Sequence, residues 1–145
     1  MRKLQLNGLE YLTAIKNGEI ASSPMSEIIP MRLSVVRENY VEYEVRPDHR
    51  HFNLQGGIHG GFCATVLDSV TGAAVHTTVD AGVSFSTIDL NVKMLKAMKN
   101  SETYTAIGEV IRIGRNVLTS EGRIVDKDGK LYAFGSATLL VTGRK

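Results

Sequence analysis

One helix-like segment constrains the fold of this chain more than any other feature. Residues 60–76 read GGFCATVLDSVTGAAVH, and nine of the fifteen residues from Phe62 to His76 are apolar. These apolar residues are spread around the helical wheel instead of forming one stripe, which is typical of a buried helix. A helix of this length, roughly 25 Å at the rise per residue of an α-helix, needs other elements packed around it.

The elements that can surround this helix are strands joined by short turns. Residues 32–47 alternate apolar and polar side chains on either side of a turn-like RENY, which predicts a hairpin. Further strand-like segments cover residues 86–95, 103–113, 117–125 and 130–141, and the Asp-Gly pair at 128–129 predicts a hairpin between the last two. We therefore expect an α+β domain in which an antiparallel sheet wraps around one central helix.

The face of the segment 86–95 follows from its alternation. The apolar residues Ile88, Leu90, Val92 and Met94 alternate with Thr87 and other polar residues, so we expect these four side chains to point to one core.

The first thirty residues form a peripheral part of what we expect to be a single domain, residues 1–145. Asn7, Glu10 and Gly18 are placed to cap a short helix over LEYLTAIK at both ends. Residues 20–30 hold two of the three prolines and two serines, which predicts irregular chain.

Composition limits the classes of partner. The chain has 17 Lys plus Arg against 15 Asp plus Glu, and a net charge of +2 gives no general argument for binding nucleic acid or a membrane. No window is apolar enough to be a signal peptide or to span a bilayer, and the lone Cys63 cannot form an intrachain disulfide. We expect a cytoplasmic protein.

The loop before the central helix is rich in glycine. Glycines at 56, 57, 60 and 61 permit close approach to the main chain, and the first helical turn offers unpaired N–H groups. Such a loop can hold an anion or a developing oxyanion, although it lacks the pattern of a nucleotide-binding P-loop. The alternative is that the glycines only make a tight entry into a packed helix.

Asp68 is the one carboxylate within the apolar helix. A charge there is costly to bury without a partner, so either Asp68 is paired or it faces a cleft. A paired Asp68 would accept hydrogen bonds from Thr65, Thr71 or a neighbouring strand. In a cleft, it could act as a general base or a nucleophile.

The histidines and the cysteine favour structural roles. His59 directly precedes the helix, where it could contact a ligand or hold the loop by bonding to backbone. His49, His51 and His76 show no metal-ligand spacing, so we expect no metal site. Cys63 is expected to be a small core residue.

The stretch NLQGGIHGGFCATVLD, residues 53–68, resembles hotdog-fold acyl-CoA thioesterases of the phenylacetate-pathway (PaaI-like) type. The pattern combines an asparagine, a His-Gly-Gly six residues later and an acidic residue eight after the first of those glycines. The resemblance extends along most of the chain from residue 30 onward, and a hydroxyl position on the third strand falls on Thr87.

The resemblance implies a hotdog fold that hydrolyses acyl-CoA thioesters without a metal or organic cofactor. Asp68 would be the nucleophile or general base, the Gly60 N–H would polarise the thioester carbonyl, Asn53 would place water or the acyl group, and Thr87 would support them. Further substrate contacts would come from Ile58, His59 and Gly61, with Arg112 and Arg115 meeting the nucleotide phosphates or standing as solvated surface charges. The stretch KAMKN lacks a proline that the family often shows.

The resemblance also implies a homodimer with composite active sites, which can pair into a dimer of dimers. Geometry points the same way, because Gly60 and Asp68 would be about 12 Å apart on one straight helix. Two other functions stay open: a hotdog dehydratase or hydratase, for which His51-Phe52 would supply the histidine, and a non-catalytic protein that binds acyl-CoA. The acyl group, aryl or medium-chain, is not determined by the sequence.

Overall fold

The computed structural model describes residues 5–145 as three helices, a short 3₁₀ helix and six strands. The helices are α1 (Gly8–Lys16), α2 (Met25–Ile28) and α3 (Gly60–His76), and the 3₁₀ helix η2 covers His49–His51. The strands are β1 (Met31–Arg37), β2 (Tyr40–Val45), β3 (Val83–Met94), β4 (Tyr104–Ile113), β5 (Val117–Val125) and β6 (Leu131–Arg144).

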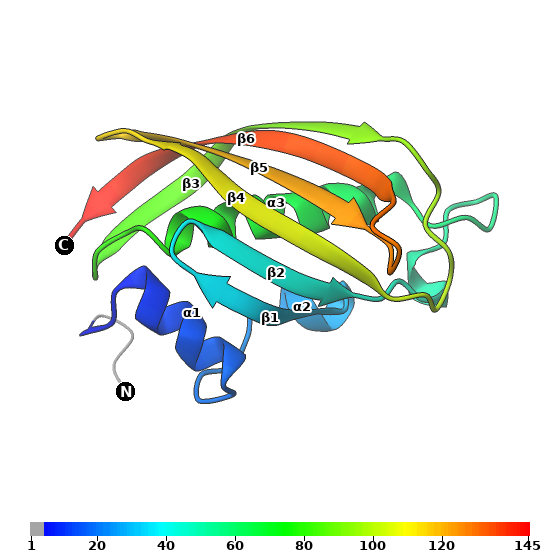
Figure 1. Ribbon diagram of the computed structural model, residues 1–145, viewed down its shortest axis with the longest axis horizontal. Coiled ribbons are helices and arrows are strands. Elements are labelled where there is room, and N and C mark those ends of the chain that lie inside the picture. The colour runs from blue at the N-terminus through cyan, green and yellow to red at the C-terminus, as the bar shows by residue number, and fades with distance from the viewer. Residues whose placement is uncertain (1–4) are drawn as a thin grey trace.

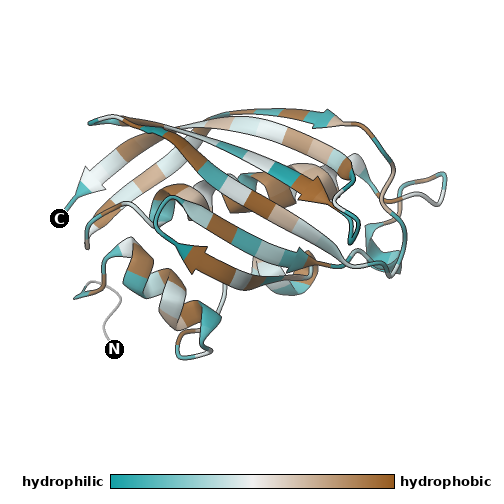
Figure 2. Cartoon of the chain, in the orientation of Figure 1, coloured by the Kyte–Doolittle hydropathy of each residue, from teal (hydrophilic) through white to brown (hydrophobic). Residues whose placement is uncertain are grey.

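All six strands form one antiparallel sheet in the order β1-β2-β4-β5-β6-β3. The sheet curves around α3, and α1 lies beside β1 (Figure 1). Apolar and polar residues alternate along the strands, as the colours of Figure 2 show, so that one face packs on α3 and the other faces outward. The predicted α+β domain with a sheet wrapped around one helix is confirmed.

Both predicted hairpins are present. β1 and β2 are joined by a turn in which Asn39 has a φ of 68°, and β5 and β6 by a turn in which Gly129 has a φ of 79°. Positive φ is accessible to glycine and, at lower frequency, to asparagine, which explains why these residues occupy the two turns.

Three glycines lie side by side across the sheet and form the seat of α3. Gly108 of β4 pairs with Gly122 of β5, which pairs with Gly135 of β6. A Cβ atom at Gly108 would lie 2.1 Å from the carbonyl oxygen of Val70, and one at Gly122 would lie 3.2 Å from Leu67 Cδ2. α3 therefore packs directly against the backbone of these strands, with Leu67 and Val70 toward the sheet.

α3 is not buried on all sides within one chain, which corrects the expectation from its composition. The sheet covers its apolar faces, while one stripe of small and polar residues remains exposed or half-buried. The stripe follows helical spacing and consists of Gly61, Thr65, Asp68, Gly72 and His76. Because the residues at this spacing lie on one side of a helix, Asp68 faces away from the glycine seat.

The expected face of β3 is wrong at Ile88 because the strand has a β-bulge there. The pairing with β6 shifts between Thr87 and Asp89, so Thr87 lies opposite the buried Leu139. Ile88 is 58% exposed, whereas Leu90 and Val92 pack against the core as expected. Met94, at the end of the strand, is 53% exposed but lies over Gly60 of α3. A bulge adds one residue to one strand and reverses which face the following side chains occupy. It turns Thr87 toward α3.

The N-terminal helix is capped as predicted. The Asn7 side chain accepts a hydrogen bond from the Glu10 N–H, and the Glu10 carboxylate accepts one from the Asn7 N–H, both at 2.9 Å. α1 packs on β1 and buries Leu12, and the Gly8 N–H donates to the carbonyl oxygen of Val79 beyond the end of α3. Residues 20–30 differ from the expectation by one short helix, α2.

Within residues 5–145, no helix combines the length and apolar character that crossing a bilayer requires.

Candidate active site

The largest of the described cavities lies between α3, β3 and the N-terminal segment, and it has a volume of about 590 Å³. One wall is the C-terminal part of the open stripe of α3, from Asp68 to His76, together with Phe85 and Thr87 of β3. The facing wall comes from α1, the serine-rich chain around Pro24, and the β1–β2 hairpin. The lining includes Tyr11, Leu12, Ile15, Met31, Tyr43, Asp68, Ser69, Gly72 and Thr87.

Asp68 opens onto this cavity from the middle of α3. The two threonines that could have paired with it bond elsewhere: Thr65 Oγ1 donates to the Gly61 carbonyl at 2.9 Å, and Thr71 Oγ1 donates to backbone carbonyls of Leu67 and Asp68. Within residues 5–145 the Asp68 carboxylate makes no hydrogen bond and no ion pair. Of the two alternatives, the carboxylate faces a cleft.

Two hydroxyl groups lie in the same wall as Asp68. Ser69 follows it on α3, and Thr87 reaches the cavity from β3 because of the bulge. Like the carboxylate, neither hydroxyl has a hydrogen-bond partner in the described part of the chain. The cavity thus holds an acceptor that can take a proton and two hydroxyl groups that can orient water or an acyl group.

The start of α3 offers one free backbone donor. His59 caps the helix, because its Nδ1 accepts from the Gly61 N–H at 2.9 Å and its carbonyl oxygen accepts from the Phe62 N–H at 2.9 Å. The Gly60 N–H, in contrast, has no acceptor among residues 5–145. A free N–H at the positive end of a helix is suited to stabilise an oxyanion. His59 is thus a cap, which was the structural alternative, and Gly61 is already used by that cap.

Gly60 lines a second, smaller cavity of about 170 Å³, together with Ile58, Cys63 and residues 94–98. Met94 covers the glycine closely, since a Cβ atom at Gly60 would lie 2.7 Å from Met94 Sδ. Cys63 is buried here as expected, and burial raises the pKa of its thiol.

Asn53 organises the loop that leads to Gly60. Its Oδ1 accepts from the N–H groups of Gln55 at 2.9 Å and Gly57 at 3.1 Å, and its own N–H donates to the Gly57 carbonyl at 2.7 Å. Asn53 and His59 line a third, exposed pocket beside Leu54, away from Asp68. In this chain the Asn53 side chain therefore positions the loop.

The predicted residues of the loop, α3 and β3 fall into three groups. Asp68 and Thr87 share the large cavity, whereas Gly60 and Ile58 share the small one, and the loop residues Asn53 and His59 lie beyond it. Eight residues of helix, about 12 Å, separate Gly60 from Asp68. One chain does not bring the candidate oxyanion donor and the candidate carboxylate to the same reacting carbonyl.

Residues 55–133 match the family model of the thioesterase superfamily. The chain belongs to this superfamily. The matched range contains Asp68, Gly60 and Thr87, so the superfamily assignment applies to the segment that carries the candidate carboxylate, backbone donor and hydroxyl.

One curated relative is a candidate esterase of Caenorhabditis elegans, which is 34% identical over 66% of this chain and 57% of that protein. The chain therefore spans little more than half the length of that relative. Mouse acyl-coenzyme A thioesterase 13 is 27% identical over 66% of this chain and 68% of the mouse protein.

Solved structures agree with the superfamily fold. A phenylacetic acid degradation-related protein of Ralstonia eutropha, described as a candidate thioesterase, is 27% identical with a TM-score of 0.81 over 90% of this chain and 99% of that one. The PaaI protein of Escherichia coli shares the fold at 14% identity, with a TM-score of 0.82 over 94% and 97% of the chains. A thioesterase protein of Streptococcus pneumoniae with coenzyme A shares it at 24% identity and a TM-score of 0.72, over 79% and 90%. The predicted hotdog fold is confirmed.

Arg112 and Arg115 lie apart from the cavities of this thioesterase-superfamily chain. Arg112 of β4 lies opposite Thr119, on the outer face of the sheet, and Arg115 lies in the β4–β5 turn, where its carbonyl oxygen accepts a hydrogen bond from Arg144. Both arginines are exposed, and neither lines a described cavity.

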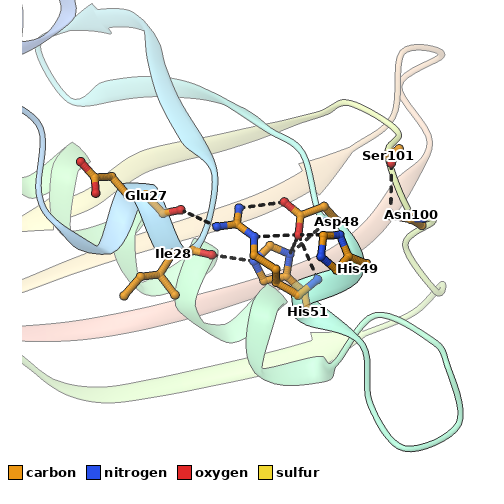
Figure 3. Close-up of polar contacts among 8 residues, drawn as sticks. Glu27, Ile28, Asp48, His49, His51, Asn100 and Ser101 are labelled. Atoms are coloured by element: carbon orange, nitrogen blue, oxygen red, sulfur yellow. Dashed lines mark hydrogen bonds and ion pairs between the residues drawn. The ribbon is translucent and has the colours of Figure 1, made fainter.

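His51 has a structural role in the neighbourhood shown in Figure 3. Its Nδ1 accepts from the Asp48 N–H at 2.9 Å, its Nε2 bonds to the Ile28 carbonyl oxygen at 2.6 Å, and its ring packs on Phe62. Arg50 holds the pKa of the Asp48 carboxyl well below its usual range. With both ring nitrogens bonded to backbone and no place in the Asp68 cavity, His51 does not supply the histidine that a dehydratase would need.

Metal ligands do not gather in the described part of the chain: from residue 5 onward, no three His, Cys, Asp or Glu side chains are grouped to hold an ion.

Sequence reasoning missed the far wall of the large cavity. Tyr11, Leu12 and Ile15 of α1 and Tyr43 of β2 line it, although α1 was expected to be a peripheral cover. The alternation of β2 correctly predicts that Tyr43 points inward, but no local pattern indicates that an inward residue meets a cavity instead of a packed core.

Proposed function

We propose that this protein hydrolyses the thioester bond of acyl-CoA to a free acid and coenzyme A. The observation that carries the proposal is the Asp68 carboxylate, which has no partner among residues 5–145 and opens onto a cavity of about 590 Å³. A carboxylate in such a place, in a chain of the thioesterase superfamily, is suited to attack or to activate water. A relative named acyl-coenzyme A thioesterase supports the thioester class.

The proposed chemistry uses groups of the chain and one water molecule. Asp68 either attacks the thioester carbon itself or takes a proton from the water that attacks. The carbonyl oxygen becomes negative and accepts a hydrogen bond from the Gly60 N–H, while the Thr87 hydroxyl supports the nucleophile. The C–S bond then breaks, and the thiolate leaves and takes up the proton that the attacking water gave to Asp68. Where Asp68 itself attacks, the thiolate leaves first, and the water then hydrolyses the acyl–Asp68 anhydride, which yields the free acid, restores the carboxylate and supplies the proton of the thiol.

The same geometry leads us to propose a homodimer with composite sites. Gly60 and Asp68 open onto different cavities of one chain, so the donor and the carboxylate of one site must come from two chains. Two α3 helices that run antiparallel across a two-fold axis would place the start of one near the middle of the other. β3 is a twelve-residue edge strand that exposes Ile88 and Met94, and an unpaired edge of this length is suited to pair with a second copy.

The nucleotide of the substrate needs a binding surface of its own. Relatives of the same fold bind coenzyme A, as the Streptococcus pneumoniae structure shows for that protein. Arg112 and Arg115 stay predictions for the phosphates, and a partner chain would have to bring the substrate to the outer end of the β4–β5 hairpin for them to take part.

The release of free thiol tests the proposed activity. Purified protein is supplied with a panel of aryl-CoA and medium-chain acyl-CoA substrates, and thiol is followed with a chromogenic disulfide reagent. Hydration of an enoyl-CoA, read as loss of its absorbance without thiol release, would instead indicate a hydratase. Binding without either reaction would indicate a carrier or sensor, and both results would contradict the proposal.

A further inference from the structure

Tyr43 is a buried polar residue that the proposed chemistry does not use. It lies on the inner face of β2, between Val41 and Val45, and is 9% exposed. Its neighbours across the sheet are Leu33 of β1 and Ala106 of β4, neither of which has a polar side chain. Within residues 5–145, the Tyr43 hydroxyl forms no hydrogen bond.

The missing partner shows where this hydroxyl points. Among the described residues, no side-chain nitrogen or oxygen that is fully shielded from solvent lacks a hydrogen-bond partner. The Tyr43 oxygen lacks a partner, so it must keep some accessible surface. Among the described cavities, Tyr43 lines the large one. The hydroxyl therefore opens into that cavity. Buried tyrosine hydroxyls ordinarily find a partner, which makes this an exception that a ligand could resolve.

Tyr43 and the candidate catalytic groups lie on opposite walls of the cavity. Thr87 comes from β3, the sixth strand in the sheet order, and Tyr43 comes from β2, the second, with Asp68 on the helix between them. The space between these walls is bordered by apolar side chains, among them Leu12, Ile15 and Met31. An acyl group whose carbonyl lies at Asp68 would extend past apolar residues toward Tyr43.

We propose that Tyr43 is a specificity-determining residue that hydrogen-bonds an oxygen carried by the acyl group beyond its thioester carbonyl. The inference rests on the proposed thioester hydrolysis, because it takes Asp68 as the place of the carbonyl. The favoured substrates are acyl groups with an apolar middle and one distal hydroxyl or carbonyl oxygen. An unsubstituted acyl group of the same length would leave the buried hydroxyl unpaired, and leaving such a group unpaired is costly.

The hydroxyl can serve as a donor at any physiological pH. Burial raises the pKa of Tyr43 to about 12, so the phenol stays protonated. It can donate to a carbonyl or a hydroxyl oxygen, and it can also accept from a hydroxyl.

The test compares hexanoyl-CoA with a series of hydroxyhexanoyl-CoA substrates that differ in the position of the hydroxyl. Wild-type protein should hydrolyse at least one hydroxylated member with a kcat/KM about tenfold above that of hexanoyl-CoA, the effect of one net hydrogen bond. Tyr43→Phe should bring this ratio to about one, because it removes the hydrogen bond to the hydroxylated substrate and the cost of leaving the hydroxyl unpaired when hexanoyl-CoA binds. Tyr40→Phe is the matched control, since Tyr40 lies on the same strand and its hydroxyl bonds to Glu42 on the outer face at 2.7 Å. It should keep the wild-type ratio.

Binding of the free acids separates this inference from the proposed function. Calorimetry compares hexanoic acid with the hydroxylated acid that corresponds to the best substrate, or with the whole series if no thioester is cleaved. A preference for a hydroxylated acid that Tyr43→Phe removes would support the role of Tyr43 even if no thiol were released, and only the hydrolase proposal would then fail. Equal ratios in wild-type and Tyr43→Phe proteins, by kinetics or by binding, would overturn the role of Tyr43.

A structural role for Tyr43 predicts a different pattern. Because the hydroxyl has no partner in the described part of the chain, Tyr43→Phe should leave the melting temperature of the unliganded protein nearly unchanged. A large fall in melting temperature together with an unchanged substrate ratio would show that Tyr43 only supports the fold.

Discussion

Asp68 of α3 and Thr87 of β3 open onto one cavity because β3 bulges at Ile88. Without the extra residue, the alternation of the strand would place Thr87 on the outer face of the sheet, together with Asp89. The exposed Ile88 side chain is a consequence of the same irregularity. The bulge thus decides whether a hydroxyl stands beside the carboxylate, and it places that hydroxyl on the edge strand where a second copy would pair.

Replacing Asp68 tests the candidate nucleophile or base. We expect Asp68→Asn, which keeps the size and removes the charge, to lower kcat by roughly 10² to 10⁴ with a modest change in KM. The carboxylate has no partner in the described chain, so the variant should unfold at the same denaturant concentration as wild type. Asp89→Asn, an exposed carboxylate on the outer face of β3, is the control. Wild-type turnover in folded Asp68→Asn protein would refute the mechanism.

Replacing Gly60 tests the backbone donor. We expect Gly60→Val to abolish thiol release while lowering stability little, because the nearest obstacle to a Cβ atom there is the flexible end of the Met94 side chain, at 2.7 Å. The double variant Gly60→Val with Met94→Ala relieves that contact but leaves the branched side chain in front of the N–H. Recovery of activity in the double variant would show that crowding against Met94, and not access to the N–H, caused the loss.

Mixing two inactive variants tests the composite site. Gly60→Val and Asp68→Asn proteins are unfolded together and refolded, which makes about half of the dimers mixed by random pairing. Each mixed dimer should contain one doubly damaged site and one intact site, so about a quarter of the wild-type activity should return. Native mass spectrometry counts the mixed dimers. Their presence without activity, or a monomeric wild-type protein, would contradict the shared arrangement.

Replacing a glycine of the seat tests how closely α3 packs on the sheet. A Cβ atom at Gly108 would meet the Val70 carbonyl oxygen at 2.1 Å, so Gly108→Ala should force α3 to move and cost about 3 kcal/mol of unfolding free energy. Gly72→Ala is the matched comparison within the helix, because a Cβ atom there would have no neighbour within 4 Å. It should stabilise the protein by about 0.5–1 kcal/mol. Urea unfolding measures both, and equal effects would contradict the packing of α3 on the seat.

Gly72→Ala should also change activity, since Gly72 lines the Asp68 cavity. The added methyl group would narrow the space for the acyl group, so KM should rise more for large acyl groups than for acetyl-CoA in the same thiol assay.

The sequence predicts those elements whose cause is local. The Asn7–Glu10 capping box, the positive-φ turn at Gly129 and the apolar circumference of α3 are properties of a few neighbouring residues, and each led to the correct element. The bulge at Ile88 depends on pairing with β6, more than forty residues later, so simple alternation could not show it. The glycine seat likewise depends on the register of three strands.

The candidate site is predictable to a different degree. Asp68 stands out because one carboxylate interrupts an apolar helix, and the structure leaves it without a partner among the described residues. The contribution of α1 could not be foreseen, because Tyr11 and Ile15 meet the cavity only through the way α1 docks on β1. His59 was expected either to contact a ligand or to hold the loop by bonding to backbone. The hydrogen bond from the Gly61 N–H to its Nδ1 shows that it caps the helix.

The two walls of the Asp68 cavity are built from different parts of the chain. Asp68, Gly60 and Thr87 all fall within residues 55–133, the range shared with the thioesterase superfamily, whereas α1 and Tyr43 precede it. Under the proposed hydrolysis, substitutions in the first fifty residues would change which acyl group fits without altering Asp68, Gly60 or Thr87. Relatives could then share the reaction and still differ in the acyl group they prefer. The preferred acyl group of a relative would be a poor guide to that of this chain wherever their N-terminal walls differ.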